Sequence, residues 1–309
     1  MNAAVRAVAR TGFARGWEVM GIEAGYRGLL ENRIRPLENR MVGGILHRGG
    51  TVLGTARSTE FATPEGQERA VRRLADAGVE GLVVIGGNGS LTGGLRLEER
   101  GVKVVGIPAT IDNDVWGTDT AIGVDTALNT ALEAIDRIKD TASSHQRAHV
   151  VEVMGRDCGY LALMSAIAGG AEAAVVPEFE PRPEALLLFL KKAYEQGKSH
   201  FIVVVAEGAP LSAEELHDYV NDAQGTYDSR LTTVGHIQRG GNPTASDRIL
   251  GSRLGTAAVD ALAEDAHGTM VGVRGERIER VPLAEVIGKE RPLDPDLYRM
   301  AEILAELPE

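Results

Sequence analysis

VKVVGIPATIDND, residues 102–114, is the stretch that decides the fold of this chain. An apolar run ends in Pro108, and a threonine and two aspartates follow at once. Such a run is typical of a strand buried in a parallel sheet, because helices cover both faces of these sheets. Ligands of open α/β sheets bind at the carboxyl ends of the strands. Thr110, Asp112 and Asp114 are therefore predicted to lie where the chemistry takes place.

The composition is that of a globular protein without the excess of basic residues that a nucleic-acid binder carries. The chain has 309 residues, 43% apolar and 25% charged, enough for one large domain or two of ordinary size. A formal net charge of -11 argues against nucleic acid or an anionic membrane as partner. The one cysteine, Cys158, excludes an internal disulfide framework and a multi-cysteine metal site. No signal peptide and no apolar run of about 18 residues is present, so we expect a cytoplasmic protein.

Short apolar runs alternate with helical patterns along the chain. This alternation predicts βαβ units, an α/β fold and mostly parallel sheets. Strands are expected at 81–85, 102–107, 150–153, 173–176 and 201–205. Helices are expected at 65–77, 123–139, 183–196 and 244–264, after an opening helix at 1–16 and a first strand candidate at 17–22. No Pro/Gly-rich linker is present, so two domains would be interwoven, with the chain crossing between them more than once.

A glycine-rich segment, VVIGGNGSLTGG at 83–94, has the pattern of a strand, a tight turn and the start of a helix. Glycines let backbone amides approach an anion closely, and a helix N-terminus adds partial positive charge. The segment is a candidate phosphate cradle. A tight turn with no ligand is an equally good interpretation of the pattern alone.

The two aspartates could divide the work of a phosphoryl transfer. In extended backbone, residues i and i+2 share one side, so Asp112 and Asp114 are expected to face one cavity together with Thr110. One carboxylate would take a hydroxyl proton while the other holds Mg²⁺. The alternative is that both acids only stabilise a loop.

Four arginines lie next to predicted strands, where they could meet a phosphate. Arg147 precedes the run at 150–153 and Arg156 follows it, while Arg230 and Arg239 flank the run at 231–237. The planar guanidinium fork matches phosphate oxygens, and several converging on one point imply a dianion. Each alone would more often be a surface residue.

Two further residues carry a functional and a structural interpretation. His236 could donate a hydrogen bond to a sugar phosphate or be a core histidine. Glu207, directly after the run at 201–205, could bind a sugar hydroxyl or be a solvated loop acid.

Five motifs together resemble the 6-phosphofructokinase family, and the likeness extends from Met1 to about residue 290. They are GGNGS at 86–90, PATIDND at 108–114, SSHQR at 143–147, VEVMGR at 151–156 and GHIQRGG at 235–241. The resemblance implies two interwoven Rossmann-like domains with three αβα layers. Residues 1–123 with 238–288 would form the nucleotide (phosphoryl donor) domain, and 124–237 with 289–309 the sugar-phosphate domain.

The resemblance implies transfer of a phosphoryl group from ATP to the 1-hydroxyl of fructose 6-phosphate, in glycolysis. Asp112 would be the general base, assisted by Thr110, Arg57 and Arg156. Contacts to fructose 6-phosphate would come from Thr110, Asp112, Asp114, Arg147, Met154, Gly155, Arg156, Glu207, Arg230, His236 and Arg239. ATP would be bound by Tyr26, Arg57, Ser58, Gly87, Asn88, Gly89, Ser90 and Gly93.

The resemblance also implies a metal, an oligomer and an effector site. Mg²⁺ would be held by Asn88 and Asp114, although Asn88 stands where the family usually has an acid. Arg147 and Arg230 would reach the sugar phosphate of a neighbouring subunit, which predicts a homotetramer with shared active sites. Allosteric effectors would bind Arg6, Arg10, Lys139, Glu172 and Lys198, where Lys139 replaces an arginine.

Other functions remain open beside the ATP-dependent kinase. Members that use pyrophosphate typically carry bulkier residues at the positions of Gly89 and Ala109, and these small residues favour ATP. The family opens with a strand and a GGDxPG loop just before the segment matching Met1 onward, so we expect the sequence to begin at an internal methionine. The third hypothesis is a catalytically impaired subunit, missing this donor loop and with Asn88 in place of an acid, that binds sugar phosphate or regulates an active partner. A dinucleotide oxidoreductase is disfavoured, because no G-x-G-x-x-G follows an early strand.

Overall fold

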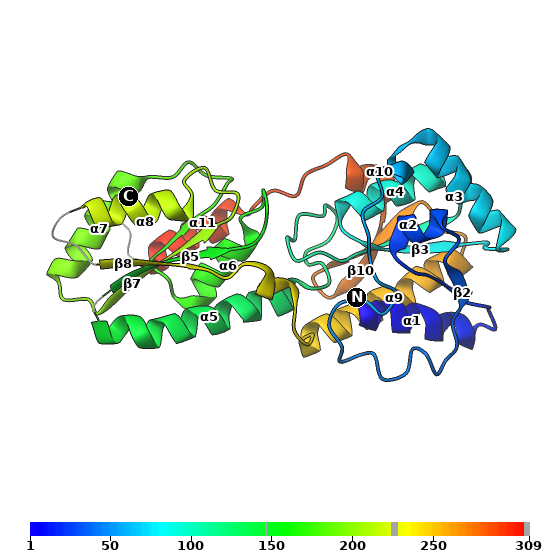
Figure 1. Cartoon of the computed structure of the whole chain (residues 1–309), viewed down its shortest axis with the longest axis horizontal. Coiled ribbons are helices and arrows are strands. Elements are labelled where there is room, and N and C mark those ends of the chain that lie inside the picture. Colours follow the sequence, from blue (N-terminus) through cyan, green and yellow to red (C-terminus); the bar gives the residue numbers. More distant parts are fainter. Residues whose placement is uncertain (146, 224–227, 306–309) are drawn as a thin grey trace. The chain divides into compact units, whose positions relative to one another are not determined.

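The chain folds into two compact α/β units, each built from three segments of the sequence. The computed structural model describes residues 1–145, 147–223 and 228–305, and only the backbone of 143–145. Unit 1 comprises Met1–Thr110, Asp114–Gly123 and Gly241–Arg291, and unit 2 comprises Ile111–Asn113, Val124–Gly240 and Pro292–Glu309. Figure 1 shows the chain coloured from the N-terminus to the C-terminus. The functional roles of the two units stay a prediction.

The sheet of unit 1 has four strands in the order β10-β9-β4-β3. Its strands are β3 (Leu82–Gly86), β4 (Val104–Pro108), β9 (Thr269–Arg274) and β10 (Arg277–Pro282). β3, β4 and β9 are parallel, and β10 returns antiparallel beside β9. All five residues of β4 are buried, as predicted for a strand covered on both faces.

Helices cover both faces of this sheet. α1 (Asn2–Ala14) and α9 (Ala245–Ala263) pack on one face, where α9 contributes Leu250 and Leu254 to the core. The two helices approach closely because Gly255 has no side chain: a Cβ there would lie 2.6 Å from the Cβ of Ala7. The other face carries α2 (Gly25–Leu30), α3 (Pro64–Asp76), α4 (Asn88–Glu98) and α10 (Leu283–Ile287). The 3₁₀ turn η1 (Glu60–Ala62) precedes α3, and β1 (Met20–Ile22) pairs antiparallel with β2 (Ile34–Pro36).

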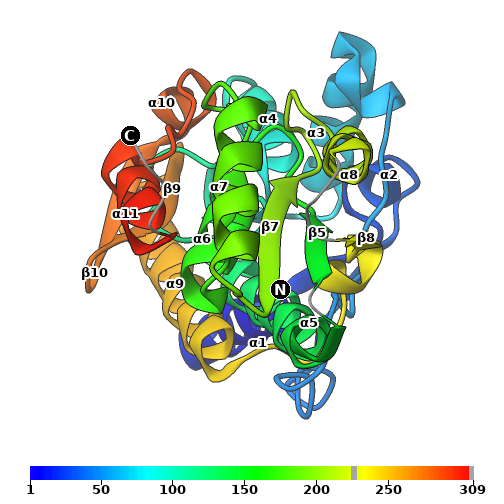
Figure 2. The ribbon, with the colours of Figure 1, turned by 90° about the vertical axis from the view of Figure 1, so that its left-hand side faces the viewer.

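Unit 2 has an all-parallel sheet in the order β6-β7-β5-β8. Its strands are β5 (Arg147–Val153), β6 (Ala173–Val175), β7 (His200–Ala206) and β8 (Asp228–Thr233). α7 (Pro183–Glu195) and α8 (Ala213–Asp222) cover one face, and α5 (Val124–His145), α6 (Tyr160–Gly169) and α11 (Pro295–Ala305) cover the other (Figure 1). Figure 2 shows α7 beside β7. The rings of Phe189 on α7 and Phe201 on β7 meet edge to face, with 5.5 Å between their centroids.

The predicted fold class is confirmed, and most element bounds agree within a few residues. The helix predicted at 123–139 is longer, because it continues to His145. The apolar run at 231–237 spans two elements: β8 ends at Thr233, and the 3₁₀ turn η2 spans Gly235–Arg239. The backbone leaves the extended conformation at Val234, which has αR dihedral angles, and Gly235 follows with a φ of 59°. In the described part of the chain, no helix has the length and apolar character needed to span a membrane.

Candidate active site

The glycine-rich turn, residues 86–90, joins β3 to α4 in unit 1. β3 ends at Gly86 and α4 begins at Asn88, and no side chain caps this helix. A Cβ at Gly86 would lie 2.4 Å from Ser90 Oγ, and one at Gly87 would lie 3.3 Å from Thr110 Cβ. Because Gly86 and Gly87 have no side chains, the turn can lie close to Ser90 and Thr110. Uncapped backbone amides at a helix N-terminus suit an anion such as a phosphate.

Tyr26 supports this turn from α2. Its hydroxyl donates a hydrogen bond to the Ser90 carbonyl at 2.6 Å, and burial raises the pKa of Tyr26. Its ring stacks on Phe61 with 3.9 Å between centroids. A Cβ at Gly93 would lie 2.5 Å from the ring, so Gly93 makes room for Tyr26. The structure thus gives Tyr26 and Gly93 a supporting role beside the predicted nucleotide contact, and it adds Phe61, which the sequence analysis missed.

Asn88 and Asp114 meet in unit 1, as expected for a pair predicted to hold metal. Asn88 Nδ2 donates to Asp114 Oδ2 at 2.9 Å. The other carboxylate oxygen, Asp114 Oδ1, is buried and has no hydrogen-bond partner in the structure. A buried carboxylate oxygen in this state is costly unless something satisfies it, and Mg²⁺ is a chemically fitting group. The described residues contain no cluster of three or more His, Cys, Asp or Glu that could hold a metal, so water and phosphates would supply the further ligands of Mg²⁺.

Asp112 lies in unit 2, where it pairs with Arg156. The carboxylate is 4% exposed, and its Oδ2 lies 3.6 Å from Arg156 Nε. The expectation that Asp112 and Asp114 share one side of an extended chain is wrong. Asn113, between them, has a φ of 55°, and a left-handed residue breaks the alternation of extended backbone. The two acids therefore contact different partners.

Arg156 is itself held in a left-handed conformation. Its φ is 52°, and the φ of Gly155 is 152°. A non-glycine residue there costs on the order of 1–2 kcal/mol. Glu207, directly after β7, accepts hydrogen bonds from the backbone N–H of Arg156 at 2.6 Å and of Gly155 at 3.3 Å. A carboxylate that accepts from backbone amides makes strong hydrogen bonds, and these offset the strain at Arg156.

Gln238 anchors the turn that carries His236 and Arg239. Its side chain is 1% exposed, and its Oε1 accepts from the backbone N–H of Met154 at 2.7 Å. Met154 is buried, whereas His236 and Arg239 are exposed on the same 3₁₀ turn. The sequence analysis missed Gln238. Its place between two candidate ligands in GHIQRGG was the available signal.

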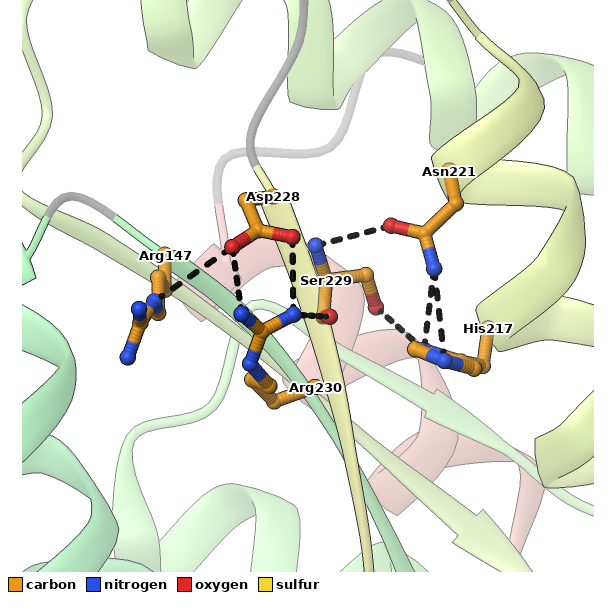
Figure 3. A network of polar contacts seen from close by, with 6 residues as sticks. All are labelled: Arg147, His217, Asn221, Asp228, Ser229 and Arg230. Atoms are coloured by element: carbon orange, nitrogen blue, oxygen red, sulfur yellow. Dashed lines mark hydrogen bonds and ion pairs between the residues drawn. The ribbon is translucent and has the colours of Figure 1, made fainter.

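Arg147 and Arg230 converge on one carboxylate in unit 2 (Figure 3). Arg230 binds Asp228 through two contacts, Nη1 to Oδ1 at 2.8 Å and Nη2 to Oδ2 at 2.7 Å. Arg147 Nε lies 3.6 Å from Asp228 Oδ2. These two arginines thus lie beside the same carboxylate, and their role at a phosphate stays a prediction. Arg147 opens β5, but Arg230 lies inside β8 and not at its end, which corrects the predicted position.

Sequence comparison assigns the chain to a family. A family model described as phosphofructokinase matches residues 1–262. The chain belongs to the phosphofructokinase family. It is 52% identical over 308 residues to the ATP-dependent 6-phosphofructokinase 1 of Thermus thermophilus, with 99% of this chain and 95% of that protein covered. The ATP-dependent 6-phosphofructokinase of Natranaerobius thermophilus is 48% identical over 305 residues, with the same shares covered. The resemblance drawn from the motifs is confirmed.

Solved phosphofructokinase structures share the fold. The phosphofructokinase of Pichia pastoris in the T-state matches with a TM-score of 0.89 and 39% identity over 93% of this chain. This chain spans 34% of that longer protein. The pyrophosphate-dependent phosphofructokinase of Marinobacter aquaeolei matches with a TM-score of 0.83 over 99% of this chain and 87% of that chain. At 22% identity, that second likeness concerns the fold alone.

The remaining nucleotide candidates of this family member lie in unit 1. Arg57 and Ser58 belong to the segment between β2 and η1, where Arg57 is exposed and Ser58 Oγ accepts from Phe61 N–H at 3.2 Å. Gly89 is exposed, and a Cβ there would meet no heavy atom within 4 Å. The glycine-rich turn is therefore open at this position.

Three of the predicted effector residues gather in unit 2. Glu172 is buried, and its Oε1 lies 2.8 Å from Lys198 Nζ. Both line a cavity of about 270 Å³ beside α6 and α11. Lys139 Nζ donates to the carbonyl of Gly170, which also lines the cavity, at 3.0 Å. Arg6 and Arg10 lie on α1 in unit 1, and their effector role stays a prediction.

Proposed function

We propose that the chain transfers the γ-phosphoryl group of ATP to the 1-hydroxyl of fructose 6-phosphate, forming fructose 1,6-bisphosphate and ADP in glycolysis. The observation that carries the proposal is the buried Asp112 carboxylate paired with Arg156, directly after the strand β4. The relatives named ATP-dependent 6-phosphofructokinase, at about half identity over nearly the whole chain, support the same reaction. Catalysis of this kind rests on positioning and on charge stabilisation.

On the acceptor side, Asp112 would take the proton of the attacking hydroxyl. A base must lie within hydrogen-bond reach of the proton it removes, and a buried carboxylate is a suitable group. Arg156 would orient Asp112 and stabilise the charge on the phosphoryl group in transit. Thr110, two residues before Asp112, would donate a hydrogen bond from its hydroxyl to the donor or the acceptor.

On the donor side, the backbone amides of Gly87, Gly89 and Ser90 would hold the phosphates of ATP, with Tyr26 and Gly93 supporting the turn. Asp114 would hold Mg²⁺ with Asn88 beside it, and the ion would neutralise phosphate charge when bound. Arg57 and Ser58 would complete the contacts to the donor. These roles rest on the family resemblance together with the contacts described above.

Charged side chains of unit 2 would bind the sugar phosphate. Arg147 and Arg230 would bind the 6-phosphate of a neighbouring subunit's substrate, in a cytoplasmic homotetramer. Glu207, His236, Arg239 and the backbone at Met154 and Gly155 would contact the sugar and its phosphate. The exposure of His236 and Arg239 in the single chain agrees with a binding role.

Parallel assays with two donors test the proposal. The formation of fructose 1,6-bisphosphate from fructose 6-phosphate is measured with Mg-ATP and with Mg-pyrophosphate at equal concentrations. We expect turnover with ATP and none above background with pyrophosphate, because Gly89 leaves open space where a nucleotide's α-phosphate would lie. Activity with pyrophosphate alone would establish the pyrophosphate-dependent alternative. Binding of fructose 6-phosphate without turnover on either donor would establish the impaired-subunit alternative.

A further inference from the structure

One exposed carboxylate forms ion pairs with both arginines that are proposed to bind the 6-phosphate. The Asp228 carboxylate contacts two guanidinium nitrogens of Arg230, Nη1 at 2.8 Å and Nη2 at 2.7 Å (Figure 3). Its Oδ2 also lies 3.6 Å from Arg147 Nε. The fork of Arg230 is the group that would bind two phosphate oxygens at once. In the structure this fork is already filled by a carboxylate.

The pairing of β5 and β8 places these groups on one side of the sheet. Arg147 is the register partner of Asp228, and His149 is the register partner of Arg230. Registered residues of neighbouring strands, and residues i and i+2 of one strand, share a side. His217 and Asn221, also drawn in Figure 3, instead contact Ser229, which belongs to the opposite side of β8. Of the residues drawn in Figure 3, Asp228 is therefore the one whose negative charge lies beside Arg147 and Arg230.

His149 adds no charge to this group. It is 8% exposed, and neither ring nitrogen has a hydrogen-bond partner in the structure. Burial, and then the charges of Arg147 and Arg230, lower the pKa of His149, which keeps the ring neutral. Two guanidinium groups thus face one carboxylate, and the group has a net positive charge of one.

We propose that Asp228 is a displaceable counter-anion that competes with the substrate's phosphate for Arg147 and Arg230 and thereby raises the KM for fructose 6-phosphate. The inference rests on the proposed function, which gives these arginines to the 6-phosphate. Exposed ion pairs are weak, and the side chains of Asp228 and Arg230 are 56% and 47% exposed. A phosphate dianion carries twice the charge of the carboxylate and fits the same fork, so it displaces Asp228 when the substrate binds.

The test replaces the Asp228 carboxylate by an amide of the same shape. Asp228→Asn, in the full-length protein, should lower the KM for fructose 6-phosphate roughly three- to tenfold at unchanged kcat, as expected for removing exposed ion pairs from the free enzyme. Inorganic phosphate should inhibit the variant at correspondingly lower concentrations. Asp228→Glu keeps the charge and should retain a KM near that of the wild type.

A matched control removes a carboxylate from another exposed arginine pair of the same unit. Glu133 pairs with Arg137 on α5, and Glu133→Gln should leave the KM unchanged. An equal fall of KM in Glu133→Gln would overturn the proposal, because the effect would then come from net charge.

A second variant separates this inference from the proposed function. Arg230→Ala should raise the KM for fructose 6-phosphate by at least tenfold if Arg230 binds the 6-phosphate. If Arg230→Ala raises the KM while Asp228→Asn leaves it unchanged or raises it, the counter-anion role of Asp228 is wrong and the proposed function stands. If Arg230→Ala leaves the KM unchanged, the role given to Arg230 in the proposed function is wrong.

Discussion

The glycine-rich turn of unit 1 and the arginine-bearing strands of unit 2 both face a phosphate in the proposed reaction, yet they are built differently. The turn has few charges: it offers backbone amides, the neutral amide of Asn88 and one acid, Asp114. Unit 2 offers charged side chains, and three of its arginines lie beside a carboxylate: Arg156 beside Asp112, and Arg147 and Arg230 beside Asp228. In the proposed reaction, backbone amides and a metal would therefore bind the donor, whereas the acceptor's phosphate would replace a carboxylate at the arginines.

Arg156→Ala should lower kcat strongly, because it removes a charge that no backbone group can replace. We expect kcat to fall about 10²- to 10³-fold, the usual loss when a group that stabilises transition-state charge is deleted. Steady-state rates at saturating ATP and fructose 6-phosphate measure it. Arg156→Lys keeps the charge and should lose less, and equal losses in the two variants would contradict a charge-based role.

Glu207→Gln tests whether catalysis depends on the left-handed backbone of Arg156, the partner of Asp112. The amide weakens the hydrogen bonds that Glu207 Oε1 accepts from Arg156 and Gly155. Charge-assisted hydrogen bonds are about twice as strong as neutral ones, so we expect kcat to fall roughly tenfold through misplacement of Arg156. In the double variant Glu207→Gln with Arg156→Gly, the glycine relieves the strain. This double variant should lose no more activity than Arg156→Gly alone, and additive losses would speak against coupling.

Asn88→Asp makes the donor side more like the acceptor side by adding a charge. A carboxylate in place of the amide would face Asp114 at about the distance of the present hydrogen bond, 2.9 Å. Repulsion should lower the melting temperature without metal, and Mg²⁺ should restore it at concentrations a few-fold lower than for the wild type. Thermal unfolding titrated with Mg²⁺ measures this without any turnover. An unchanged Mg²⁺ midpoint would show that residue 88 does not face the metal.

His149 should give the smallest effect, on stability as a function of pH. Its pKa is lowered in the folded chain by burial, then by Arg147 and Arg230, with a further contribution from His200. Below its unfolded pKa of about 6.5 the unfolded chain binds a proton that the folded chain resists, so stability falls as pH drops through this range. Denaturant midpoints between about pH 8 and 5.5 should therefore fall less in His149→Val than in the wild type. A wild-type slope in His149→Val would contradict the account.

The fold was predictable because it depends on local patterns. Buried apolar runs such as the one leading to Pro108 were recognisable as strands, and the motifs around them identified the family. The sequence also named both members of the contacts between Asn88 and Asp114 and between Asp112 and Arg156.

Contacts made across the sheet were not predictable. Asp228 is important because β5 lies beside β8, and Gln238 because η2 folds back on Met154, and neither pairing leaves a trace in local sequence. The left-handed backbone at Asn113 was also missed, because an asparagine between two aspartates fits extended and turn conformations equally well.

The proposed role of Asp112 as the base for the sugar hydroxyl can be tested by separating phosphoryl transfer from substrate binding. The single-turnover rate of phosphoryl transfer from labelled ATP to fructose 6-phosphate is compared between the wild type and Asp112→Asn, alongside equilibrium binding of fructose 6-phosphate. We expect a rate about 10²- to 10⁴-fold lower with binding changed by less than a few-fold, because the amide keeps the shape and cannot take the proton. A near-normal transfer rate in Asp112→Asn would contradict the account.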